Sequence, residues 1–157
     1  VFKYGYDRFF ARCASAGISG IIVPDMPLEE KGEVADIAAK HGVDVISLIA
    51  PTSKERIAKI AKSATGYIYI VSSMGVTGMR SEIKTDLESI VRVVKENTSV
   101  PAAIGFGINT PEQAKKYAGI ADGVIVGSAI VKIIEKYGEN AAEPVYNYVK
   151  EMADAVK

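Results

Sequence analysis

Three glycine-rich segments of the chain are suited to holding an anion, because each follows an apolar run typical of a strand. The segments are GVTGMR at residues 75–80, GFGI at 105–108 and VGSAI at 126–130. Glycine lets the backbone approach a ligand closely and frees N–H groups to face it. In the third segment, Ser128 is expected where a strand passes into a helix, and the N-terminus of a helix attracts phosphate. Together the segments predict a phosphate-binding site.

Each segment also has a purely structural interpretation. Residues 75–78 suit an ordinary surface loop, although the connection from 74 to 86 is longer than most strand-to-helix loops. The second segment suits a tight turn around a buried Phe106, and Ser128 suits the N-cap of the following helix. We favour phosphate because the second and third segments end the last two strands and an extra helix follows. Barrels built from β/α units often bind phosphate at that place.

Composition excludes several other kinds of site. The single cysteine, Cys13, and the single histidine, His41, exclude a disulfide framework and a multi-histidine metal site, so no metal is expected. Cys13 lies on an apolar helical face and is expected in the core, and His41 is expected at a helix end. The glycines are not followed by lysine as in a P-loop, and the pattern of a dinucleotide-binding turn is absent.

The net charge and the hydropathy pattern of the chain argue against several classes of binding partner. The chain has 157 residues, with 19 basic and 19 acidic side chains, so its formal net charge is zero. A balanced charge argues against nucleic-acid binding, which needs a basic face, and against electrostatic attachment to a membrane. Apolar runs fall short of the roughly 18 residues of a spanning helix, and we expect a cytoplasmic protein.

The elements that position the glycine segments alternate along the chain. Five short apolar runs predict parallel strands that are buried on both faces. Amphipathic stretches between them predict helices, with Thr110 as an N-cap and Gly42 just after a helix end. The predicted strands are residues 18–24, 43–50, 66–73, 100–107 and 121–128, and the predicted helices are residues 6–16, 28–40, 54–63, 87–96, 112–118 and 143–156.

Two architectures fit this alternation, which predicts a parallel sheet with right-handed crossovers. A doubly wound sheet of five strands suits the length well. An eight-stranded β/α barrel needs about 250 residues, so as a barrel the chain is expected to hold the last five of eight units. We expect one domain over residues 1–157, a partial barrel that lacks its N-terminal strands.

The segments named above resemble the tryptophan synthase alpha chain family, in order and spacing, over essentially the whole chain. Besides the three glycine segments, the resemblance rests on the opening VFKYG, on the strand ends VPDMP and APT, and on the strand GYIYI. It implies the last five β/α units of an eight-unit TIM barrel. It also implies a lyase of tryptophan biosynthesis, which cleaves indole-3-glycerol phosphate to indole and glyceraldehyde 3-phosphate by a retro-aldol reaction.

The resemblance assigns roles to individual residues. The phosphate-binding backbone is expected at Gly78, Gly107, Gly127 and Ser128, and the lid at Gly75 and Thr77. The indole pocket is expected at Ile22, Phe106 and Ile125, with Tyr69 supporting the acid chemistry. Asp25 and Pro27 are expected to face the beta chain of tryptophan synthase, the partner that holds pyridoxal phosphate. No cofactor is expected in this chain.

The resemblance also implies that the family's catalytic carboxylates lie on the second barrel unit and its following loop. Because this chain matches the family from after the third strand, we expect it to lack both carboxylates and to be inactive alone. The alternative is a non-catalytic half-barrel that binds a phosphorylated ligand or a partner, with homo-oligomers formed through the exposed sheet edges. Other phosphate-binding barrels, such as indole-glycerol-phosphate synthase, are disfavoured by residues 75–78 and by the opening segment.

Overall fold

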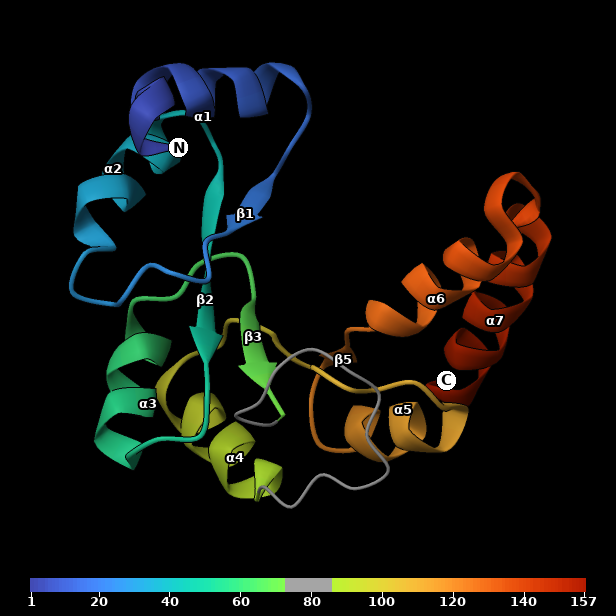
Figure 1. Cartoon of the computed structure of the whole chain (residues 1–157). Helices are drawn as coiled ribbons and strands as arrows, with labels where there is room; N and C mark the ends of the chain where they lie inside the picture. Colours follow the sequence, from blue (N-terminus) through green and yellow to red (C-terminus); the bar gives the residue numbers. More distant parts are fainter. Residues whose placement is uncertain (73–85) are drawn as a thin grey trace.

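The computed structural model describes residues 1–72 and 86–157. Five parallel strands form a single sheet in chain order, β1-β2-β3-β4-β5 (Figure 1). The strands are β1 (Gly20–Ile22), β2 (Asp44–Ile49), β3 (Ile68–Val71), β4 (Ala102–Gly105) and β5 (Gly123–Val124). Each is shorter than the strand predicted from its apolar run, because residues at both ends of the run lie outside the strand.

The order of the strands decides between the two architectures. In a doubly wound sheet the strand order reverses part-way, and helices cover both faces. Here every strand pairs with its neighbour in sequence, and the helices lie around the outside of one curved face (Figure 1). The chain therefore folds as five consecutive units of a β/α barrel, and the doubly wound alternative is wrong.

Three of the described helices have N-cap side chains that accept a hydrogen bond from a backbone N–H in the first turn. Ser53 accepts a hydrogen bond from the Arg56 N–H, and Asp86 accepts one from the Ser89 N–H. Thr110 and Gln113 form a reciprocal capping box, which confirms the N-cap predicted at Thr110. The helices are α1 (Tyr6–Ser15), α2 (Gly32–Lys40), α3 (Lys54–Lys62), α4 (Leu87–Asn97), α5 (Pro111–Ala118), α6 (Ser128–Tyr137) and α7 (Ala142–Ala155), with short 3₁₀ turns at Phe2–Tyr4 and Gly138–Asn140.

The core lies between the outer face of the sheet and the helices. Every second strand residue points to it, because successive side chains in a strand alternate between faces. One cluster gathers around Ile49, Ile70 and Ile104 with α3, α4, α5 and α7. A second joins α1 and α2 to β2, and includes Phe10 and Cys13, so the expected place of Cys13 in the core is confirmed.

The inner face of the sheet is only partly covered within the described residues. The register aligns Leu48, Tyr69 and Ala103 on that face, and all three are half-buried. Ile22, at the end of β1, is 41% exposed. β1 and β5 each pair with one strand in the part of the chain described, so the outer edge of each is open.

Two local expectations need revision. α2 begins at Gly32, four residues later than predicted, because residues 28–31 form turns rather than a helix. His41 does end this helix, and Gly42 after it has φ 68°, as expected for a glycine beyond a helix terminus. Across residues 1–72 and 86–157, no helix is both long enough and apolar enough to cross a bilayer.

Candidate functional site

The backbone just after β4 adopts an unusual conformation. Phe106 has φ 78° and Gly107 has φ 90°, so two consecutive residues lie in the left-handed region. Phe106 is the one non-glycine residue with positive φ in the part of the chain that the structure describes. The side chain of Asn109 donates to the Gly107 carbonyl at 2.8 Å, whereas the N–H groups of Gly107 and Ile108 donate to no described residue. Ile108 is buried at 3% exposure, whereas Gly107 is only half-buried, so the Gly107 N–H is the donor of this turn that a ligand can reach.

The start of α6 lies beside this turn, because β4 and β5 are parallel neighbours and their carboxyl ends share one edge. The helix begins at Ser128 and its N-cap is Gly127, so the structural interpretation of Ser128 as the N-cap is wrong. Both residues are exposed, and a Cβ added at Gly127 meets nothing within 4 Å. The first N–H groups of α6 therefore open to the same edge of the sheet as the Gly107 turn.

Tyr69 crosses from β3 to the end of β4. A Cβ built on Gly105 comes within 2.5 Å of the Tyr69 hydroxyl and 2.7 Å of its ring carbon Cζ, so only glycine leaves room for this ring. Burial raises the pKa of the Tyr69 phenol, and the negative charge that Tyr67 would carry raises it further. The Tyr69 hydroxyl therefore stays protonated at neutral pH and can donate a hydrogen bond at the inner face.

The three residues expected in an indole pocket divide between the two edges of the sheet. Ile125 follows β5, donates its N–H to the Ile104 carbonyl at 2.8 Å, and so lies beside Phe106. Ile22 lies at the end of β1, the opposite edge of the five-stranded sheet. The structure therefore places Phe106 and Ile125 at neighbouring strand ends, whereas two strands separate Ile22 from Phe106 and three separate it from Ile125.

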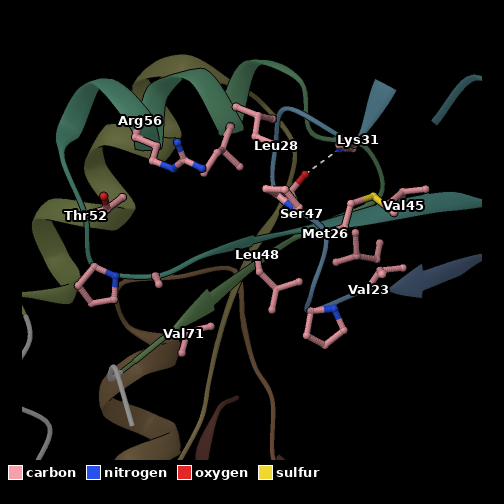
Figure 2. A pocket seen from close by; sticks show the side chains of 16 residues that line it. Val23, Met26, Leu28, Lys31, Val45, Ser47, Leu48, Thr52, Arg56 and Val71 are labelled. Carbon is pink, nitrogen blue, oxygen red and sulfur yellow. Dashed lines mark hydrogen bonds between the residues drawn. The ribbon is translucent and has the colours of Figure 1, made fainter. Parts of the chain in front are cut away.

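A cavity of about 470 Å³ lies between β2 and the segment that follows β1 (Figure 2). Its walls are mostly apolar, with Val23, Met26, Leu28, Leu48 and Val71 among them. The segment after β1 forms one wall. Pro27 lines the cavity, whereas Asp25 is exposed and does not.

Lys31 connects the segment after β1 to the sheet through hydrogen bonds. Its ammonium donates to the Ser47 hydroxyl at 2.8 Å, a contact drawn in Figure 2, and to the Ser63 carbonyl at 3.0 Å. Burial lowers the pKa of Lys31, and the nearby Asp44 carboxylate opposes that effect. Arg56 lies at the mouth of the cavity and pairs with Glu29 at 3.1 Å. Sequence analysis did not find this cavity, because Lys31 and Ser47 meet only after folding.

The lid residues Gly75 and Thr77, and the phosphate-binding residue Gly78, lie outside the described residues. In residues 1–72 and 86–157, no group of three or more metal-ligating side chains comes together. The described part of the site is therefore an apolar inner face, with a hydroxyl at Tyr69 and backbone donors at the ends of β4 and β5.

Comparison with known proteins identifies the family. The family model described as "Tryptophan synthase alpha chain" matches residues 1–157. The chain belongs to the tryptophan synthase alpha chain family. A tryptophan synthase alpha chain of Lacticaseibacillus casei is 53% identical over 156 residues, which cover 99% of this chain and 59% of the relative.

Solved structures agree with this assignment. The tryptophan synthase alpha subunit of Campylobacter jejuni matches with a TM-score of 0.82 and 32% identity, over 96% of this chain and 60% of that one. A structure of the tryptophan synthase α2β2 complex of Pyrococcus furiosus matches with a TM-score of 0.86 and 34% identity, over 98% and 62%. The chain thus spans about three fifths of the length of these family members, and it folds as the C-terminal five units of their barrel.

Proposed function

We propose that this chain forms the phosphate side and one wall of the aromatic pocket of a tryptophan synthase alpha subunit. The whole protein then takes part in tryptophan biosynthesis, as a lyase that converts indole-3-glycerol phosphate to indole and glyceraldehyde 3-phosphate. The observation that carries the proposal is the Gly107 N–H after β4, which has no partner among the described residues, together with the exposed start of α6. Such donors suit the phosphate that indole-3-glycerol phosphate carries.

The reaction places different demands on the two ends of the substrate. Cleavage breaks the bond between indole C3 and the glycerol carbon that carries a hydroxyl; C3 gains a proton, the hydroxyl loses one, and an aldehyde forms. The Gly107 turn, Gly127 and Ser128 would hold the phosphate, with Gly78 completing the cradle. Phe106 and Ile125 would lie against the indole ring, with Ile22 on the far wall. The protonated Tyr69 hydroxyl would orient the reacting side chain.

The proton for indole C3 needs a carboxylic acid, and the indole N–H needs a second carboxylate. In the proposal, both come from the two fifths of the family fold that this chain does not match. Asp25 lies three residues after the end of β1, but its side chain is exposed. We assign Asp25, together with Pro27, to the face toward a beta chain. Pyridoxal phosphate would belong to that beta chain, and this chain would hold no cofactor.

Titration with glycerol 3-phosphate, followed by the amide NMR signals of the chain, tests the phosphate site. Glycerol is the matched control, because it lacks only the phosphate. The expected result is saturable shifts at Gly107, Gly127 and Ser128 with glycerol 3-phosphate and none with glycerol. Shifts confined to surface lysines, or no shifts, would refute the proposal.

An activity assay tests the assignment of the acids. A preparation whose intact mass is 16.7 kDa should release no indole from indole-3-glycerol phosphate. Turnover by that verified chain would contradict the assignment of both carboxylates to the unmatched part of the family fold.

The open sheet edges favour a second property of the chain by itself. β1 and β5 each expose an edge among the described residues, and Ile22 is 41% exposed on the inner face. Unpaired edges and an uncovered apolar face favour association with another chain. We propose that the chain forms homo-oligomers, so light scattering after size-exclusion chromatography should give a mass of at least twice 16.7 kDa. A stable monomer would count against this proposal.

A further inference from the structure

Ser72 connects the end of β3 to the turn after β4. Its side chain is fully buried, at 0% exposure. Its N–H donates to the Gly105 carbonyl at 3.0 Å, which extends the strand pairing by one residue. Its hydroxyl donates to the carbonyl of Phe106, 34 residues away in the sequence. Ser72 therefore holds the left-handed residue of the turn through that residue's own carbonyl.

The planarity of the peptide bond links this hydrogen bond to the anion site. The Phe106 carbonyl and the Gly107 N–H belong to one peptide group, and in a trans peptide they point in opposite directions. No cis peptide occurs among the described residues. Because Ser72 holds the carbonyl toward β3, the Gly107 N–H must face away from it. That N–H is one of the two donors that have no partner among the described residues.

The conformation needs such a restraint. A residue with a side chain is disfavoured in the left-handed region and persists there only when its surroundings hold it. Without the hydroxyl, rotation of the peptide group would relax Phe106 and turn the Gly107 N–H away from the ligand. A buried serine could instead matter only for packing, and the experiment must separate these two roles.

We propose that Ser72 is a positioning residue, which orients the Gly107 N–H toward the phosphate of the substrate. This inference rests on the proposed function. It makes Ser72 important for affinity toward phosphate, although its side chain is fully buried and holds the turn through a backbone carbonyl.

The matched control is Ser47, which among residues 1–72 and 86–157 is the other buried serine, at 6% exposure. It lies on β2, next to β3, and its hydroxyl binds Lys31 rather than the turn. We compare Ser72→Ala with Ser47→Ala in the affinity of the chain for inorganic phosphate and for glycerol 3-phosphate, and in thermal stability. Both variants should lose stability, because each removes the hydrogen bond that a buried serine makes: Ser72 with the Phe106 carbonyl, and Ser47 with the Lys31 ammonium.

Only Ser72→Ala should lose affinity, by about ten-fold for both phosphates, and Ser47→Ala should stay within about two-fold of the parent chain. Ser72→Cys keeps a side-chain donor at this position, although the thiol is weaker as a donor and larger than the hydroxyl, so its affinity should lie between the two. This variant decides the question if Ser72→Ala does not fold.

Two results would overturn the inference, and they differ from each other. If the parent chain binds neither phosphate, the proposed function fails, and the role of Ser72 fails with it. If the parent chain binds, but Ser72→Ala and Ser72→Cys lose no more affinity than Ser47→Ala, the phosphate site stands and Ser72 is only a packing residue.

Discussion

The two ends of the β4–β5 pair differ in how fully their backbone groups are satisfied. At the amino end, Asp122 accepts a hydrogen bond from the Ala102 N–H at 2.9 Å and donates its own N–H to the Ala102 carbonyl at 2.9 Å. Lys95 adds an ion pair with Asp122 at 3.2 Å. At the carboxyl end, the half-buried Gly107 offers an N–H that no described residue accepts. We call the amino end of the β4–β5 pair the closed end, because Asp122 and Ala102 pair their backbone groups there. We call the carboxyl end the open end, because a backbone donor is left without a described partner.

This difference suggests that the amino end of the β4–β5 pair contributes to the stability of the fold and the carboxyl end to ligand binding. Barrel enzymes bind ligands at the carboxyl ends of their strands and leave the amino ends to stabilise the fold. Substitutions at the closed end should therefore change stability without changing affinity for phosphate. Substitutions at the open end should change affinity, and they should change stability only where a side chain does not fit.

The largest effect is expected from Gly105→Ala. Its Cβ would come within 2.5 Å of the Tyr69 hydroxyl, so the ring must move and the packing of the inner face must change. We expect a loss of about 2 kcal/mol in the free energy of unfolding, measured by urea denaturation. Gly123→Ala is the control, because its Cβ meets Ala103 at an ordinary 3.7 Å. Equal stability of the two variants would show that the Tyr69 ring moves at no cost.

Gly107→Ala should lower the free energy of unfolding by less than Gly105→Ala does, but it should weaken phosphate binding more. The left-handed φ of 90° at Gly107 is unfavourable for alanine, at a cost of about 1–2 kcal/mol. Relaxation of the turn would also redirect its donors, so titration with glycerol 3-phosphate should show weaker binding. Gly127→Ala, at φ −123°, provides the comparison for stability and should change it by less than about 0.5 kcal/mol. Unchanged affinity of Gly107→Ala would place the phosphate elsewhere.

Asp122→Ala tests the closed end. It removes the hydrogen bond to Ala102 and the half-exposed pair with Lys95, so the free energy of unfolding should fall by about 1 kcal/mol. Affinity for glycerol 3-phosphate should not change. Lys95→Met, which removes only the exposed partner, should cost about 0.5 kcal/mol or less. Weaker phosphate binding by Asp122→Ala would mean that the two ends are coupled.

The smallest expected effect is the pH dependence of the stability that the Asp122 carboxylate contributes. The hydrogen bond from Ala102, followed by the Lys95 pair, lowers the pKa of Asp122 below its ordinary 3.8. The stability from the charged carboxylate is therefore fully present above pH 3.8, and it is lost as the pH falls through the lower folded-state pKa. Thermal midpoints of the parent chain and Asp122→Asn should therefore differ at pH 7 and converge in acid. A gap that persists at low pH would exclude the charge as its cause.

Much of the fold could be predicted from the sequence, because its signals are local. Alternating apolar runs and amphipathic stretches predicted the five strands and the helices between them. The Thr110 cap needs only residues within one turn, and so it was predicted correctly. The start of α2 was predicted four residues early, because the turn at residues 28–31 is held partly by Lys31 reaching Ser47 and Ser63. No local pattern encodes that contact.

The site could be predicted only in part. The glycines at 105–108 and 126–130 predicted an anion site, because glycine frees backbone N–H groups to face a ligand. The structure gives Gly105 another role, which is to leave room for the Tyr69 ring. The cavity beside Lys31 and the role inferred for Ser72 were not predicted. A serine in an apolar strand gives no sign of its partner when that partner is a carbonyl 34 residues away.

The sequence by itself determined the type and order of the elements, the helix caps and the resemblance to one family, because these depend on neighbouring residues and on spacing. The barrel order of the strands, expected from the family resemblance, was confirmed by the structure. Only the tertiary structure decided that Tyr69 packs over Gly105 and that Lys31 reaches Ser47. It also decided which backbone donors stay open. These features arise from contacts between strands, and side-chain alternation and strand register must be fixed in three dimensions before such contacts exist.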